Sequence, residues 1–181
     1  MTVIVGYART FGYRANAVHF DGTNDYLTLG AGLTGAADSK LLTLSFWIRK
    51  QGSDGVSERI IRSATTVGGA TSRVVVTKNT SDQISIQGVN AAATSVLIAT
   101  TTADTIEVAD GWMHVLCSVD LADTGKRHLY LDDASDATWS TYTDDSIEFT
   151  EQDWAIGATP DGSGKLDADL ADVWFAPAVY I

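Results

Sequence analysis

Two acidic segments near the ends of the chain decide the fold: FDGTNDYL at residues 20–27 and LDADLADV at residues 166–173. Each places carboxylates and turn-forming residues beside alternating apolar residues, which is typical of loops at the margins of a β-sheet. Working outward, every second residue from Leu42 to Ile48 is apolar, the period of a half-buried strand. These patterns predict that both ends of the chain contribute to one sheet.

Further predicted strands follow at short intervals. They span residues 17–20, 26–29, 59–63, 73–78, 83–89, 96–100, 105–108, 113–120, 127–131, 154–157 and 170–175. The first two are expected to pair across the turn at residues 21–25. No helix-period pattern of useful length is present. The alternation predicts an all-β fold, a two-sheet antiparallel β-sandwich of the jelly-roll kind.

The length of 181 residues suits one domain, expected at residues 16–181. Residues 1–15 mix aromatic residues, Arg and Gly without clean periodicity, and we interpret them as an N-terminal arm. Two alternatives stay open for this arm. It is either an extra strand on its own domain or a segment that docks on a neighbouring subunit.

The formal net charge of -11 disfavours nucleic acid as a partner, because the phosphate backbone would be repelled. An acidic surface suits divalent cations, although it also serves solubility alone. Cys117 is the only cysteine, so no disulfide forms within the chain, and its apolar row predicts a small buried side chain. No signal peptide and no apolar span of membrane length are recognisable, so we expect synthesis in the cytoplasm and no membrane partner.

Two internal segments, LTLSFWIR at residues 42–49 and GWMHV at residues 111–115, complete a resemblance. Together with the two acidic segments, they resemble the laminin-G-like jelly rolls of the concanavalin A-like lectin/glucanase superfamily. The resemblance covers residues 16–181 and implies a carbohydrate-binding or adhesion role.

Calcium is the cofactor that the resemblance implies, because laminin-G-like domains often hold this ion with loop oxygens. The candidate ligands are acidic or amide residues of the first loop and the closing segment: Asp21, Asn24, Asp25, Asp167, Asp169 and Asp172. Asp167 and Asp169 are two residues apart and project from the same face of a strand, so they either converge on one ion or are solvated neighbours. The alternatives are an Asx turn for Asp21 and a carboxylate that holds loop amides for Asp172.

Carbohydrate sites combine an aromatic ring with a few polar groups, and three residues are candidates for such a ring. Trp47 lies on the polar face of its predicted strand. Trp139 and Tyr142 lie in a hydroxyl-rich and acidic segment that we interpret as a loop. Loop aromatics form either a binding rim or a lid folded on the core, and both alternatives stay open.

Catalysis is not expected. Glucanases of this architecture commonly use a Glu-x-Asp-x-Glu run, which is missing here. In the nearest run, Glu148 and Glu151 are three residues apart, which would place them on opposite faces of a strand. The sequence also lacks serine-hydrolase and metalloprotease motifs.

We therefore expect a non-catalytic carbohydrate-binding, adhesion or decoration module, present in many copies on a virion such as a phage capsid or tail. Its expected partners are host-surface or environmental glycans and, through the arm, other virion subunits; a homo-oligomer is also expected. The alternatives are a purely structural virion-stabilising protein and a glycoside-hydrolase-like enzyme. For localisation, the alternatives to the virion are the bacterial cytoplasm or unconventional export.

Overall fold

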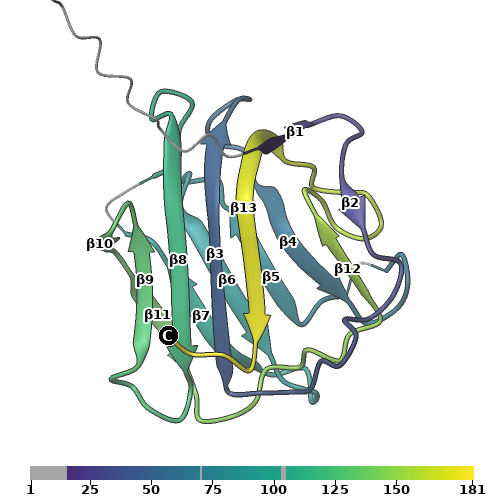
Figure 1. Ribbon diagram of the computed structural model, residues 1–181, viewed down its shortest axis with the longest axis vertical. Helices are drawn as coiled ribbons and strands as arrows, with labels where there is room; N and C mark the ends of the chain where they lie inside the picture. Colours follow the sequence, from purple (N-terminus) through teal and green to yellow (C-terminus); the bar gives the residue numbers. More distant parts are fainter. Residues whose placement is uncertain (1–15, 70, 103–104) are drawn as a thin grey trace, which may run out of the picture.

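The computed structural model describes residues 16–69, 71–102 and 105–181, and these residues form thirteen strands in two antiparallel sheets. The sheets are stacked face to face, with strands β13, β3, β8 and β9 in the front layer of Figure 1. The predicted all-β sandwich is therefore confirmed. The predicted arm, residues 1–15, lies outside the described residues.

The front layer is a six-stranded sheet in the order β1-β13-β3-β8-β9-β10. Its strands are β1 (Ala17–Asp21), β13 (Asp167–Pro177), β3 (Leu41–Lys50), β8 (Trp112–Asp120), β9 (Arg127–Leu131) and β10 (Ala134–Ser135). The rear layer is a seven-stranded sheet in the order β11-β7-β6-β5-β4-β12-β2. Its strands are β11 (Thr138–Tyr142), β7 (Ser95–Thr100), β6 (Ile84–Val89), β5 (Val74–Lys78), β4 (Glu58–Ala64), β12 (Asp153–Ile156) and β2 (Leu27–Thr28).

The two acidic segments do meet in one sheet. β1 pairs antiparallel with β13, so that Phe20 lies opposite Ala168 and Asp21 lies opposite Asp167. Phe20 is buried, and its ring lies so close to Gly157 that a Cβ there would stand 2.4 Å from a ring carbon. Gly157 also has a φ of +84°, which glycine adopts at little cost. The absence of a side chain at Gly157 therefore lets the Phe20 ring pack against the β12–β13 connection.

Three details of the predicted strand pattern are wrong. β1 and β2 do not pair across residues 21–25, because β2 belongs to the other sheet and pairs with β12. Residues 105–108 are not a strand. Residues 138–142 are a strand, β11, which pairs with β7 at the edge of the seven-stranded sheet. A turn rich in Asp and Gly is compatible with a hairpin and equally with a crossing between sheets, and only packing separates the two.

The core lies between the sheets and is filled by the inward rows of the strands. The row of Leu42, Leu44, Phe46 and Ile48 is completely or almost completely buried, as the alternation predicts. Cys117 is buried in the same layer, and burial raises the pKa of its thiol to about 12. A thiol with that pKa stays protonated at neutral pH, which fits the predicted structural role.

One end of the sandwich also contains buried charges. The Lys50 ammonium donates to Glu58 Oε1 at 3.0 Å and to the Asp167 carbonyl at 2.9 Å, which connects β3, β4 and β13. Lys78 forms an ion pair with Asp82, and its Nζ is 3.9 Å from Glu58 Oε2. Burial raises the pKa of Glu58, and the neighbouring lysines oppose this shift.

No helix within the described residues is long and apolar enough to cross a membrane.

Candidate functional site

The outer face of β13, β3 and β8 carries exposed indole rings next to polar side chains. Trp47 is 39% exposed, Trp112 36% and Trp174 46%. The antiparallel register places their strands side by side, with Trp47 opposite His114 on one flank and opposite Ala171 on the other. The outward position of Trp47 agrees with its place on the polar face of the predicted strand.

The Trp47 ring packs against the His114 ring and is still 39% exposed. Its centroid is 5.0 Å from that of the His114 ring, and a 2.8 Å hydrogen bond joins His114 Nε2 to the Ser45 hydroxyl. Ala171, on the opposite flank, has no side-chain atom beyond Cβ. Trp47 is therefore held by His114 and still presents ring surface to solvent.

Asp169 is the centre of a polar network beside this ring. Its carboxylate accepts hydrogen bonds from Arg49 Nε at 2.9 Å and Gln51 Nε2 at 2.6 Å, and it is 2.8 Å from His19 Nδ1. Burial alone would raise the pKa of Asp169, but the hydrogen bonds from Arg49, His19 and Gln51 outweigh it and lower the pKa. The Arg49 guanidinium also lies over the Trp112 ring, 5.2 Å from its centroid. Polar groups on this face are thus fixed in place before any ligand arrives.

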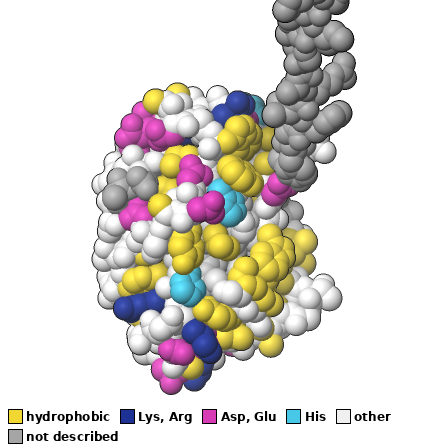
Figure 2. Space-filling model, turned by 60° about the vertical axis from the view of Figure 1, so that its left-hand side comes forward, with side chains coloured by type: hydrophobic (Ala, Val, Ile, Leu, Met, Phe, Trp, Pro, Cys, Tyr) yellow, Lys and Arg dark blue, Asp and Glu magenta, His cyan; other side chains and the backbone are white. Residues whose placement is uncertain are grey.

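Figure 2, which brings the β9 and β10 side of the molecule forward, shows hydrophobic side chains in several groups. Histidine, acidic and other polar surface separates these groups. Such a mixed surface suits an amphipathic ligand better than a continuous apolar partner.

The six residues predicted to bind calcium are spread along the β1–β13 edge. Asp167 and Asp169 do project from one face of β13, opposite Asp21 and His19 of β1. The Asp21 carboxylate accepts hydrogen bonds from the amides of Thr23 at 2.8 Å and Asn24 at 3.1 Å, which form the Asx turn considered as the alternative. These hydrogen bonds lower the pKa of Asp21.

The other predicted ligands are placed differently. Asn24 and Asp25 are exposed in the loop after β1, and Asp172 lies within a register shift of β13, with a φ of +49°. In the described part of the chain, no three His, Cys, Asp or Glu side chains are grouped closely enough to hold a metal ion. The arrangement therefore does not supply a ready-made calcium site, and calcium binding stays a prediction.

Trp139 and Tyr142 are packed on the core rather than raised on a loop. Their rings meet edge to face at 5.7 Å between centroids, and both contact the buried cluster. The Tyr142 hydroxyl donates to the Asp120 carbonyl at 2.7 Å, and burial raises the pKa of Tyr142 to about 12. Arg127 lies over both rings. The loop interpretation was wrong for these residues, and their packing corresponds to the lid alternative.

The Glu148 and Glu151 pair also differs from the sequence interpretation. Both residues lie outside the strands, so the alternation of a strand does not separate them. Both contact Arg73, whose Nε is 2.7 Å from Glu148 Oε2 and 4.0 Å from Glu151 Oε1. Glu151 is buried, and burial together with the charge of Glu148 raises its pKa. The two carboxylates are thus a buried one and an arginine-paired one.

Sequence reasoning missed a polar groove on the outer face of the seven-stranded sheet. It has a volume of about 380 Å³ and is lined by Ser57, Arg59, Arg62, Val75, Thr77, Asn79, Ser85 and Gln87. These residues come from β4, β5, β6 and the adjoining turns. The sequence did contain a signal for it: in three consecutive strands of the predicted meander, the residues that alternate with the buried ones are mostly polar.

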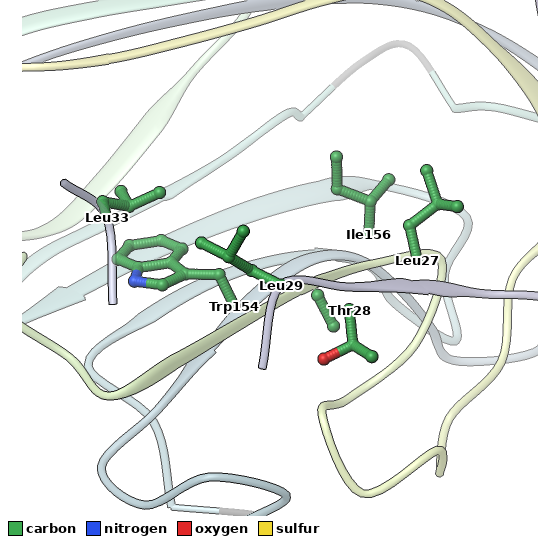
Figure 3. A pocket seen from close by; sticks show the side chains of 7 residues that line it. Leu27, Thr28, Leu29, Leu33, Trp154 and Ile156 are labelled. Atoms are coloured by element: carbon green, nitrogen blue, oxygen red, sulfur yellow. The ribbon is translucent and has the colours of Figure 1, made fainter. Parts of the chain in front are cut away.

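A second, apolar groove follows β2 and β12 at the open side of the sandwich. Figure 3 shows Leu29 and Leu33 beside the Trp154 ring and Leu27 beside Ile156. Leu27 and Leu29 are more than half exposed, at 52% and 55%. The Trp154 indole nitrogen is buried and has no hydrogen-bond partner. At this edge, exposed leucines thus lie beside the buried Trp154 and Ala155.

Comparison with solved structures supports the architecture. Domains LG4-5 of the mouse laminin alpha1 chain superpose with a TM-score of 0.56 at 15% identity, covering 94% of this chain and 46% of that chain. The chain thus spans less than half of that laminin structure. The heptameric SAP-like pentraxin of Limulus polyphemus gives a TM-score of 0.53 at 15% identity, covering 88% of this chain and 74% of that chain.

A structure described as a receptor binding domain gives a TM-score of 0.51 at 14% identity, covering 91% of this chain and 43% of that chain. At these identities the similarities show the fold alone. A search of curated proteins found no match. Residues 21–179 match a laminin G family described as the Concanavalin A-like lectin/glucanases superfamily. Because this match spans most of the sandwich, from the end of β1 to the residues after β13, the chain belongs to the laminin-G-like family of the concanavalin A-like lectin/glucanase superfamily.

Proposed function

We propose that this domain is a non-catalytic carbohydrate-binding or adhesion module, and that Trp47 is its sugar platform. The observation that carries the proposal is the exposed Trp47 ring beside the fixed polar network of Arg49, Gln51 and Asp169. The face of an indole packs against the apolar face of a pyranose, while charged and amide groups bind hydroxyls. The β13–β3–β8 face provides both kinds of group on neighbouring strands.

A ligand on this exposed face would have little of its surface covered by the protein, so each site is expected to bind weakly. Display in many copies would compensate, because linked sites bind with a high effective concentration. We therefore propose a multicopy location on a phage particle, where host-surface or environmental glycans are the ligands and residues 1–15 attach the domain to other virion subunits. The acidic net charge of -11 supports solubility in such an assembly.

A glycan array tests the proposed function. The wild-type domain is expected to bind a subset of glycans, and Trp47→Ala is expected to lose this binding while keeping the wild-type circular dichroism spectrum. Trp139→Ala is the matched control, because it removes an indole that packs on the core at the other sheet. Unchanged glycan binding by folded Trp47→Ala would refute the platform.

The second candidate is a purely structural module that binds neighbouring subunits and no sugar. The apolar groove along β2 and β12 favours it, because exposed Leu27 and Leu29 there would gain from being covered. Light scattering at increasing concentration would separate the candidates. Self-association that Leu29→Asp abolishes, together with a blank glycan array, would favour the structural module.

A further inference from the structure

A register shift in β4 brings two arginines onto one face. Arg59 lies opposite Thr77 and Arg62 lies opposite Val75, with a bulge between Arg59 and Ile61. Residues three apart in a regular strand face opposite ways, but here Ile60 and Ile61 are both buried and both arginines point outward. The bulge therefore creates a pair of cations on the outer face of the seven-stranded sheet.

Neutral polar groups on the next strands extend this pair into a groove. Thr77 lies opposite Ser85, and Val75 lies opposite Gln87. Two rows of side chains therefore cross β4, β5 and β6, one that begins at Arg59 and one that begins at Arg62. The groove contains Ser, Thr, Asn and Gln side chains but no aromatic ring. Hydroxyl and amide groups of this kind hydrogen-bond to sugar hydroxyls, whereas a nucleobase would need a ring to stack on.

Arg59, unlike several other cations of the sheets, has no carboxylate partner among the described residues. Arg49 and Arg73 form ion pairs with Asp169 and Glu148, but Arg59 is in no ion pair within the described residues. Its NH1 group donates to the Ser57 hydroxyl at 2.8 Å. Its Nε is buried and has no hydrogen-bond partner. With no ion-pair partner among the described residues, the Arg59 guanidinium can donate to an oxygen of a bound anion.

Arg62 adds positive charge to the same place. Its Nε donates to the Ser72 hydroxyl at 2.6 Å. Burial lowers the pKa of Arg62, the charge of Arg59 lowers it further, and the charge of Asp161 acts in the opposite direction. Two guanidinium groups thus repel each other in a groove within a protein of net charge -11. A ligand anion between them would relieve this repulsion.

We propose that the groove across β4, β5 and β6 binds an acidic saccharide, with Arg59 and Arg62 on its carboxylate or sulfate group and the neutral side chains on its hydroxyls. This inference extends the proposed carbohydrate binding to a second site and to a ligand class. The groove is on the sheet opposite to Trp47, so either site could fail without the other. The net charge of -11 of the whole protein selects against long polyanions and favours a short, sparsely charged glycan.

Isothermal titration calorimetry with three tetrasaccharides tests the proposal. The probes are a galacturonic acid tetramer, which carries carboxylates, a carrageenan tetramer, which carries sulfates, and neutral maltotetraose. At least one acidic tetramer is expected to bind ten times or more tightly than maltotetraose, and its affinity is expected to fall as salt is added. The preferred acidic probe identifies the anionic group.

Variants connect the binding to the two arginines. Arg59→Gln and Arg62→Gln are each expected to lower the affinity for the acidic tetramer about tenfold, which is the scale of one charged hydrogen bond. Lys40→Gln is the matched control: it removes the same charge from an exposed lysine that pairs with Asp144, outside the groove. Trp47→Ala is expected to leave the affinity for the acidic tetramer unchanged, which separates this site from the Trp47 platform.

Four results would overturn the proposal. These are equal affinity for the acidic and neutral tetramers, no binding of either acidic tetramer, wild-type affinity in folded Arg59→Gln, and an equal loss in Lys40→Gln. Thermal melts show which variants are folded. Arg59→Lys keeps the charge without the planar donor pair, so it is expected to bind more tightly than Arg59→Gln and more weakly than the wild type.

Discussion

Arg49 and Asp169 are directly paired across β3 and β13, and the guanidinium donates two hydrogen bonds to one carboxylate oxygen, from Nε at 2.9 Å and from NH2 at 2.5 Å. The same carboxylate contacts His19 of β1. The interaction thus joins three neighbouring strands, β3, β13 and the edge strand β1, on the face that carries Trp47. Its energetic contribution can be measured without disturbing the core.

Asp169→Asn is expected to lower the free energy of unfolding at neutral pH by about 1–2 kcal/mol, since Arg49 and His19 are partly exposed and solvent screens them. The folded-state pKa of Asp169 lies below its unfolded value, so its contribution is present above about pH 4 and is lost as the pH falls through the folded pKa. Urea unfolding between neutral and acid pH measures this. Asp25→Asn, in the exposed loop, is the control. Equal pH profiles for the wild type and Asp169→Asn would contradict the network.

Lys50→Met is expected to lower the free energy of unfolding by about 3–5 kcal/mol, because it leaves the buried Glu58 with the more distant Lys78 as its remaining cationic partner. Burial already raises the pKa of Glu58 above its unfolded value. A raised carboxyl pKa means that its stabilising contribution is full below the unfolded pKa and is lost as the pH rises through the folded pKa. Lys50→Met should therefore lose less stability in mild acid than at neutral pH. The double variant Lys50→Met/Glu58→Gln should recover part of the loss, and a double variant no more stable than the single one would be evidence against the pair.

Tyr142→Phe is expected to destabilise the domain by about 1 kcal/mol, through loss of the hydrogen bond to the Asp120 carbonyl. Spectrophotometric titration provides a second measurement, because burial raises the pKa of Tyr142 to about 12. The difference between the wild-type and Tyr142→Phe titrations should contain one tyrosine that ionises near that pH. Glycan binding should be retained, and its loss with the fold intact would restore Tyr142 as a binding residue.

The calcium prediction requires a change in stability when the metal is removed. A calcium ion bound at the β1–β13 edge would be lost to excess chelator, and the melting temperature would fall. Asp21→Asn and Asp167→Asn would then abolish the response, because these residues lie opposite each other on adjacent strands. A melting temperature that is the same in calcium and in chelator would exclude a stabilising calcium site.

Much of the fold was predictable from the sequence because burial in a sandwich follows the period of the strand. The row from Leu42 to Ile48 predicts both the inner face of β3 and, by exclusion, the outward position of Trp47. The hairpin of β8 and β9 and the meander of β4, β5 and β6 follow from alternation and short turns. Sheet membership was less predictable: residues 17–20 and 26–29 are both recognisable as strands, yet they belong to different sheets.

The amino-acid sequence by itself determined an all-β sandwich with Trp47 facing outward, because these properties depend on local alternation and on turn residues. Its motifs also carried the resemblance to the laminin-G-like family and the expectation that the two acidic segments share one sheet. Only the tertiary structure decided that Trp139 and Tyr142 close the core, that Asp169 pairs with Arg49, and that a bulge brings Arg59 and Arg62 onto one face. These features depend on which strands become neighbours and where one strand gains an extra residue. Both are set by packing between segments far apart in the chain, which no local pattern records.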